Sequence, residues 1–307
     1  MDMRPRLTRS WEIKLLHHSH VDLGYTHSQA EVRQIQFQHL EQAMDLIEKH
    51  KSKSDPSRFR WNSEITWILD EWLTQATPLE KKRLMRLVQE GYLGIDGLYV
   101  NLLTGLCRPE ELMASFHVKN KLEQMIDIPI NSAMISDIPG WNWGLVTALA
   151  EHGIRYLSCG PNRGDRIGYL LAEWGDKPFY WTSPSHREKV LVFVHGKGYS
   201  WFHSGLHATK RLSRKLNPRR ISRYLQKLEK QEYPYNTILL RYNIGADNGP
   251  PDSNLSDIVE VWNKRYPYMH ITISTTAQAM ADFAHTYGDH IPTVTGDLTP
   301  YWEDGAA

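Results

Sequence analysis

One stretch near the N-terminus reads Leu15-Leu16-His17-His18-Ser19-His20-Val21-Asp22-Leu23-Gly24-Tyr25. Together with Ile13, its first residues form the apolar pattern of a short buried strand, which ends in three histidines and a carboxylate. Because polar groups are costly to bury unpaired, we expect this cluster at the tip of the strand. His20 and Asp22 are two residues apart, so in extended backbone their side chains leave on the same side and could bind one ion. Gly24 then allows the chain to turn away at close range.

Two interpretations of this cluster stay open on the sequence alone. A histidine near a strand end is most often a hydrogen-bonded structural residue. Imidazole and carboxylate without thiolate, however, form a ligand set that suits a divalent ion such as zinc, with a catalytic role if one coordination position stays open. A metal site would need at least one more carboxylate or histidine from a distant strand.

The composition bounds the class of protein. The chain has 307 residues, of which 36 are basic and 35 acidic, giving a net charge of +1. α/β barrels of this length commonly form one domain, so we expect residues 1–307 to be a single α/β domain. The even charge balance argues against nucleic acid or membrane as partners. The basic run from Lys210 to Arg223 is expected to be a solvated helix face.

The cysteines and the first residues of the chain bear on the cellular compartment of the protein. Cys107 and Cys159 are far apart and lack CxxC spacing, so neither a disulfide framework nor a thiolate zinc site is indicated. No apolar stretch has the length of a signal-peptide core or a membrane span. These features fit a cytoplasmic protein.

Strand and helix patterns alternate along the chain. We expect strands near residues 13–16, 59–63, 92–100, 129–135, 154–158, 178–182, 190–195, 237–242 and 270–274, and helices near 29–50, 65–74, 78–91, 109–125, 146–152, 212–232, 255–265 and 275–286. This alternation predicts a parallel α/β fold with right-handed crossovers. In such folds the chemistry gathers at the carboxyl ends of the strands.

Two later strand ends carry further carboxylates. The strand near 129–135 runs into Asp137, then Pro139-Gly140, Trp141 and Trp143, which suggests a sugar site with one carboxylate beside flat rings. The alternative is that Asp137 caps a helix and that both tryptophans are core residues. Asp247 follows the strand near 237–242, in a loop rich in glycine and proline. A closed or nearly closed parallel barrel would place the strand ends that carry His20, Asp137 and Asp247 around one opening.

These residues resemble the N-terminal catalytic domain of the glycoside hydrolase family 38 α-mannosidases. The segment from His18 to Tyr25 is similar to the family's His-x-His-x-Asp-x-Gly-aromatic signature, and Arg60-Trp61-Asn62-Ser63-Glu64 is similar to its second strand. The resemblance implies a (β/α)7-type barrel with parallel strands, and one zinc ion, for which cobalt or manganese would also fit. It gives the ligand role to His20, Asp22 and Asp137.

The resemblance also implies a reaction. Asp137 would be the nucleophile as well as a ligand, and Asp247, in Gly245-Ala246-Asp247, the general acid and base of a retaining exo-glycosidase that hydrolyses terminal sugars such as mannose. Bound to the ion, Asp137 would stay ionised, whereas Asp247, away from it, could keep its proton. Tyr25, Trp141 and Trp143 would offer stacking surface for the carbohydrate.

The sequence departs from the family pattern at several positions. Tyr25 stands where the family commonly has tryptophan, and Ile-Pro-Gly follows Asp137 where Pro-Phe-Gly is usual. The segment Trp302-Glu303-Asp304-Gly305-Ala306 lacks the histidine that is the family's fourth ligand, and Glu303 or Asp304 could replace it. The helical and β domains that follow in the family are expected to be missing.

Two other functions remain as alternatives. A barrel-type metal-dependent amide or ester hydrolase would use His18 and His20 as ligands, with His195 or His203 from later strand ends. A non-catalytic sugar-binding domain is the second alternative. The sequence leaves the formation of a homo-oligomer open.

Overall fold

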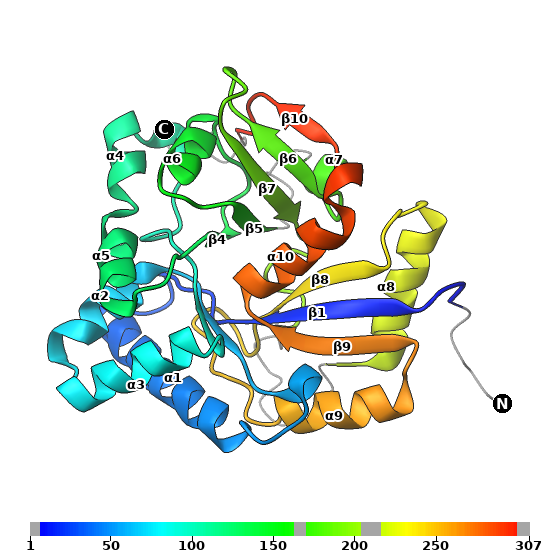
Figure 1. The fold of residues 1–307 in the computed structure, drawn as a ribbon, viewed down its shortest axis with the longest axis horizontal. Coiled ribbons are helices and arrows are strands. Elements are labelled where there is room, and N and C mark those ends of the chain that lie inside the picture. Colours follow the sequence, from blue (N-terminus) through cyan, green and yellow to red (C-terminus); the bar gives the residue numbers. More distant parts are fainter. Residues whose placement is uncertain (1–6, 163–169, 204–215, 300–307) are drawn as a thin grey trace.

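The computed structural model describes residues 7–162, 170–203 and 216–299. Mostly parallel strands form its interior and helices surround them (Figure 1). The central strand is β1 (Trp11–His17), which pairs in parallel with β8 (Thr237–Tyr242) and β9 (Met269–Ser274). The side chains of Ile13, Leu15 and Leu16 are fully buried, as the apolar run predicts.

Two further sheets complete the described strands. β2 (Trp61–Ser63) pairs in parallel with β3 (Leu93–Ile95). A five-stranded sheet has the order β10-β6-β7-β5-β4. Its strands are β4 (Ser132–Asp137), β5 (Tyr156–Pro161), β6 (Phe179–Thr182), β7 (Lys189–Val194) and β10 (Thr293–Thr295). Only β6 and β7 pair antiparallel within it.

The helices follow the strands in the expected alternation. They are α1 (Gln29–Lys49), α2 (Thr66–Gln75), α3 (Pro78–Gln89), α4 (Pro109–Ala114), α5 (His117–Ile126), α6 (Gly144–Glu151), α7 (Leu170–Trp174), α8 (Pro218–Lys230), α9 (Leu255–Arg265) and α10 (Thr276–Tyr287). Capping boxes begin two of them: Ser28 with Glu31 at α1, and Thr77 with Glu80 at α3. No helix of the described residues is both long and apolar enough to cross a membrane.

Some sequence expectations need correction. The α/β class with mainly parallel strands is confirmed, but the described strands form three separate sheets and not a closed (β/α)7 barrel. β2 and β3 are only three residues long, and a single parallel bridge between His18 and Asn62 connects them to β1. The helix expected at 109–125 is two helices, α4 and α5. In the described part of the 212–232 segment, the helix begins at residue 218.

A buried polar network fills the space between the sheets. Arg241 of β8 is buried, and its guanidinium donates to His18 Nε2 at 3.0 Å, to Ser158 Oγ of β5 at 3.2 Å, and to Ser136 Oγ of β4. It also lies 3.3 Å from the carboxylate of Glu64, beyond the end of β2. Side chains from β4, β5 and β8 and from the ends of β1 and β2 therefore meet in one interior, although these strands belong to three separate sheets.

Asp96 shows how this interior responds to pH. It is buried just after β3 and accepts hydrogen bonds from Ser132 Oγ at 2.8 Å and Thr276 Oγ1 at 2.9 Å. Burial raises the pKa of Asp96 from 3.8 to about 7. Because the folded state holds this proton more tightly than the unfolded state, the stabilisation is complete below about pH 4 and is lost as the pH rises through about 7.

We therefore expect Asp96→Asn, which mimics the protonated acid, to remove this loss. Between pH 4 and pH 8 its free energy of unfolding should improve relative to the parent by up to roughly 4 kcal/mol. Urea unfolding at several pH values measures the difference. Asp289→Asn, at an exposed position, is the control and should leave the pH profile unchanged. Parallel profiles for the parent and Asp96→Asn would contradict the expectation.

Candidate active site

A pocket of about 740 Å³ lies at the carboxyl ends of the parallel strands. Segments that follow β1, β2, β3, β4, β5, β7 and β8 contribute to its lining. The ionisable groups among the described lining residues are His20, Asp22, Tyr25, Asp137, Tyr199 and Asp247. The three strand ends that the sequence singled out thus meet in one pocket, although more than 200 residues separate the first from the last.

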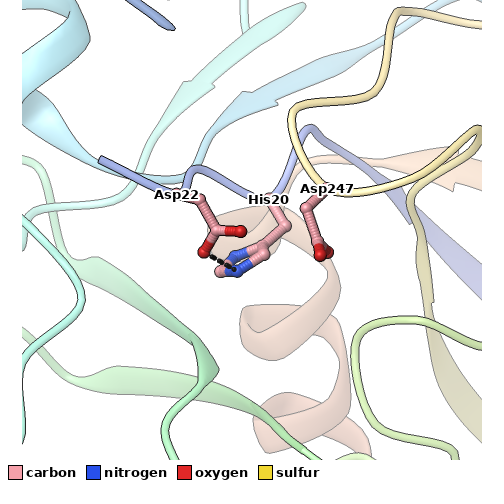
Figure 2. Close-up of side chains that lie close together, drawn as sticks. All are labelled: His20, Asp22 and Asp247. Carbon is pink, nitrogen blue, oxygen red and sulfur yellow. Dashed lines mark ion pairs between the residues drawn. The ribbon is translucent and has the colours of Figure 1, made fainter. Parts of the chain in front are cut away.

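Three of these side chains form a cluster with the spacing of a metal site. One ligand atom each from His20, Asp22 and Asp247 lies within 4.8 Å of the other two. His20 Nε2 is 3.2 Å from Asp22 Oδ1, and Figure 2 shows the two side chains pointing toward each other, with Asp247 on the other side of His20. The two-residue spacing of His20 and Asp22 after β1 therefore places both side chains on the same side, as predicted.

Glu64 orients the imidazole of His20. Its Oε1 lies 3.0 Å from His20 Nδ1. The histidine interactions hold the pKa of Glu64 well below its usual value, although burial opposes them, so the carboxylate accepts and Nδ1 carries the proton. Burial would lower the pKa of His20, but Glu64 and Asp22 raise it to about 10. At that pKa Nε2 also carries a proton near neutral pH and pairs with Asp22, so an ion that binds at Nε2 would displace this proton.

The donor atoms fit a divalent cation. Asp247 Oδ1 is buried without a hydrogen-bond partner, and His20 Nε2 is buried with the ion pair to Asp22. Buried polar atoms are rarely left in this state unless an ion or water satisfies them. One imidazole nitrogen with carboxylate oxygens is a donor set that zinc, cobalt or manganese accepts. His20, Asp22 and Asp247 could therefore hold the ion.

Asp137 shares the pocket but lies outside this cluster. It ends β4 with φ at +69°, a left-handed conformation that few residues other than glycine adopt and that often marks a functional position. Asn162 Nδ2 donates to its Oδ1 at 2.5 Å, and Tyr199 also hydrogen-bonds it. The carboxylate is thus held by Asn162 and Tyr199, and burial raises its pKa.

Asp247, expected at a distance from the metal, is instead the third member of the cluster. Burial raises its pKa, against the opposing charge of His20. The Tyr199 side chain hydrogen-bonds both Asp247 and Asp137.

The three predicted stacking residues lie in different environments. Tyr25 lines the mouth of the pocket and is 86% exposed. Trp141 is fully buried in the core, and its backbone pairs with Leu298, so its ring offers no face to a ligand. Trp143 is exposed but does not line the pocket. Of the three, Tyr25 alone is placed to contact a sugar there.

The histidines of the alternative hydrolase are engaged elsewhere. His18 Nδ1 lies 2.7 Å from Glu64 Oε2, and His18 Nε2 accepts from Arg241. His195 pairs with Ser158 Oγ at 2.8 Å and with a backbone carbonyl at 3.0 Å. His203 lies 3.9 Å from Asp247. Neither His18 nor His195 therefore has a nitrogen available for an ion, and the proposed fourth ligands Glu303 and Asp304 lie outside the described residues.

Sequence reasoning missed several residues of this site. Glu64 was visible only as the end of the second strand pattern, and nothing in its neighbours indicates that it reaches His20. Tyr199 and Asn162 lie in loops after β7 and β5, where the sequence shows no motif. A general signal was present, because each of these residues follows a predicted strand at its carboxyl end.

Comparisons with known proteins agree with this geometry. The family model for the Glycosyl hydrolases family 38 N-terminal domain matches residues 10–304. A search of curated proteins gave no match.

Solved structures with the same fold include large glycosidases. An α-mannosidase from Enterococcus faecalis V583 superimposes with a TM-score of 0.71 at 19% identity, covering 94% of this chain and 31% of that one. A glycosyl hydrolase family 38 protein from Enterococcus faecalis gives 0.63 at 17% identity, covering 94% and 29%. A 4-α-glucanotransferase from Thermococcus litoralis gives 0.52 at 14%, covering 94% and 40%. The chain thus spans about a third of the length of the first two structures.

Proposed function

The chain belongs to glycosyl hydrolase family 38, and from this membership we propose that it carries the metal-binding catalytic centre of a retaining α-mannosidase. The observation that carries the proposal is the pocket in which His20, Asp22, Asp137 and Asp247 converge from distant parts of the sequence. The substrate would be a carbohydrate with a terminal sugar, bound beside Tyr25 at the pocket mouth.

His20 and Asp22 would hold the ion together with Asp137 from the same pocket, which leaves the carboxyl group of Asp247 unbound so that it can keep a proton. When bound, a divalent ion such as zinc supplies positive charge that keeps a neighbouring carboxylate ionised, and positions that accept sugar hydroxyls. Glu64 supports this arrangement because it fixes the ring orientation of His20. The convergence of that ring with the carboxylates of Asp22 and Asp247 is the feature that favours a metal role over a purely structural one.

Asp137 and Asp247 supply the two carboxyl groups of a retaining mechanism. Asp137 attacks the anomeric carbon while Asp247 donates its proton to the departing glycosidic oxygen. Asp247 then takes a proton from water, whose oxygen adds to the anomeric carbon and releases Asp137. Retaining pairs lie about 5 to 5.5 Å apart, and inverting pairs lie about 6.5 to 9.5 Å apart. We propose the retaining arrangement, because both carboxyl groups line one pocket and Tyr199 interacts with both.

Hydrolysis of nitrophenyl α-mannoside tests this function directly. We expect the purified chain to release nitrophenol, to lose this activity with a chelator, and to regain it with zinc. Nitrophenyl acetate, assayed in parallel, would be the better substrate of the alternative ester hydrolase. Because the chain spans about a third of its structural neighbours, binding of mannose without turnover would favour the sugar-binding alternative.

Metal content provides a test that does not depend on activity. Removal of a residue that only orients a metal ligand lowers metal affinity roughly 10- to 100-fold. Because His20→Ala removes a ligand itself, we expect its affinity for zinc to fall by more than this. Equilibrium dialysis followed by elemental analysis measures this. His27→Ala, an exposed histidine seven residues further along, is the matched control and should bind as the parent does. Equal metal content in both variants would rule out the ligand role.

A further inference from the structure

A second cavity, of about 390 Å³, lies along helix α8 and outside the active-site pocket. Of the lining residues that the structure describes, five are cationic and none is acidic. These cations are Lys197, Arg219, Arg220, Arg223 and Lys227, and we call this space the basic cavity. The sequence had suggested that the basic run ending at Arg223 is a solvated face. Its described part instead borders a concave site.

Two buried aromatic rings form the floor of the basic cavity. Trp201 and Tyr224 are 7% and 4% exposed, and their ring centroids lie 5.0 Å apart. Lys197 Nζ lies 5.0 Å from the centroid of Tyr224, and the guanidinium of Arg220 lies 4.6 Å from that of Trp201. Arg220 also donates to the carbonyl of Trp201. Two of the five cations are therefore held in place before any ligand arrives.

The charges of the basic cavity are poorly compensated within the protein. Arg219 and Arg223, like Arg223 and Lys227, are like-charge pairs four residues apart on a helix, which is unfavourable. The first turn of α8 contains no acidic residue, and cations there oppose the helix dipole. In the part of the chain that the structure describes, no carboxylate forms an ion pair with any of these three residues.

One buried carboxylate interacts electrostatically with cations of the basic cavity. Asp176 is buried, accepts from the backbone N–H of Gly196 at 2.9 Å, and interacts electrostatically with Lys197 and Lys227. Among the described residues, Arg219, Arg223 and Lys227 thus bring three positive charges to the cavity, and this one carboxylate lies near them. A bound anion would relieve the repulsion and complement the helix dipole at the same time.

We propose that the basic cavity is a binding site for a phosphate group, either free or carried on a sugar. Arginine forks match the oxygens of a phosphate, and three arginines converge here. Asn217 Oδ1 already caps the backbone N–H groups of Arg219 and Arg220, so the side chains supply the direct contacts. The volume is in the range of small-molecule sites. The proposal does not rest on the glycosidase function.

The site is separate from the active-site pocket but shares a loop with it. Lys197 lines the basic cavity, and Tyr199, two residues later, lines the active-site pocket. The two pockets have no lining residue in common. Substitutions on α8 therefore probe the anion site without touching the residues assigned to catalysis.

Isothermal titration calorimetry of the whole chain tests the proposal. The probes are inorganic phosphate, glucose 6-phosphate and glucose. We expect saturable binding of both phosphate compounds with dissociation constants between about 1 µM and 1 mM, and no binding of glucose. Tighter binding of glucose 6-phosphate than of phosphate would identify a sugar phosphate as the ligand, and the reverse order would identify free phosphate.

Two charge-matched double variants make the test specific. Arg219→Gln with Arg223→Gln should weaken binding at least about tenfold, because two charge-assisted contacts are lost. Lys49→Gln with Lys82→Gln removes the same charge from exposed positions elsewhere and should bind as the parent does. Circular dichroism confirms that both fold. Equal weakening in both variants, absence of saturable binding, or tighter binding of a single-stranded oligonucleotide would each overturn the proposal.

Discussion

Asp137→Asn is expected to abolish hydrolysis of nitrophenyl α-mannoside, with a fall in kcat of at least about 10³-fold. The amide that replaces the carboxylate carries no charge, so it cannot form the covalent glycosyl intermediate of a retaining enzyme. The fold should persist, because asparagine tolerates the left-handed φ of +69° found here. Initial rates on the purified variant, with its far-ultraviolet circular dichroism, measure both expectations.

A matched control separates the carboxylate from the backbone conformation. Asp127 is also left-handed, with φ at +58°, but it is exposed at the end of α5. Asp127→Asn should therefore retain full activity. Unchanged kcat in Asp137→Asn would remove Asp137 from the mechanism.

Asp247→Asn gives a different pattern if the roles are assigned correctly. Loss of a general acid matters less when the leaving group is already acidic, as nitrophenol is. The variant should therefore lose less activity on nitrophenyl mannoside than on a mannoside with an alkyl leaving group. Equal losses on both substrates would instead indicate that Asp247 acts mainly as a metal ligand, in line with its place beside His20 and Asp22.

The sequence predicted the parts of the site that local patterns encode. The apolar run before His20 and the period of two between His20 and Asp22 are backbone properties, and they predict both the strand and the shared direction of the side chains. The same reasoning placed Asp137 and Asp247 at strand ends. Parallel strands then explain why these distant residues meet in one pocket.

What the sequence could not predict depends on contacts between distant segments. A closed barrel requires continuous backbone hydrogen bonding between every pair of neighbouring strands, for example between β3 and β4. No local sequence pattern specifies these hydrogen bonds. Burial of Trp141 likewise follows from its pairing with Leu298, more than 150 residues away. The contacts of Asp137 with Asn162 and Tyr199 likewise join three segments that lie far apart in the sequence.

Glu64→Gln is expected to be the most destabilising single substitution near the site, at about 3 to 5 kcal/mol. The carboxylate is fully buried and receives hydrogen bonds from Asn101 at 2.7 Å and Ser136 at 2.7 Å, besides its contacts with His20 and Arg241. Glutamine has the same shape, but its amide group would place N–H donors against other donors. The guanidinium of Arg241 would then stay buried without its negative partner.

Urea unfolding measures this loss, and Glu151→Gln, at an exposed position of α6, is the control that should change stability little. The zinc affinity of Glu64→Gln should also fall about 10- to 100-fold, because His20 loses the acceptor that orients its ring.

A double variant distinguishes an ion pair from general packing. Since removal of both buried charges is far less costly than removal of one, Glu64→Leu combined with Arg241→Met should be more stable than the sum of the two single losses predicts. Additive losses would show that the two charges are not coupled, and the interior network would then contribute to stability through packing alone.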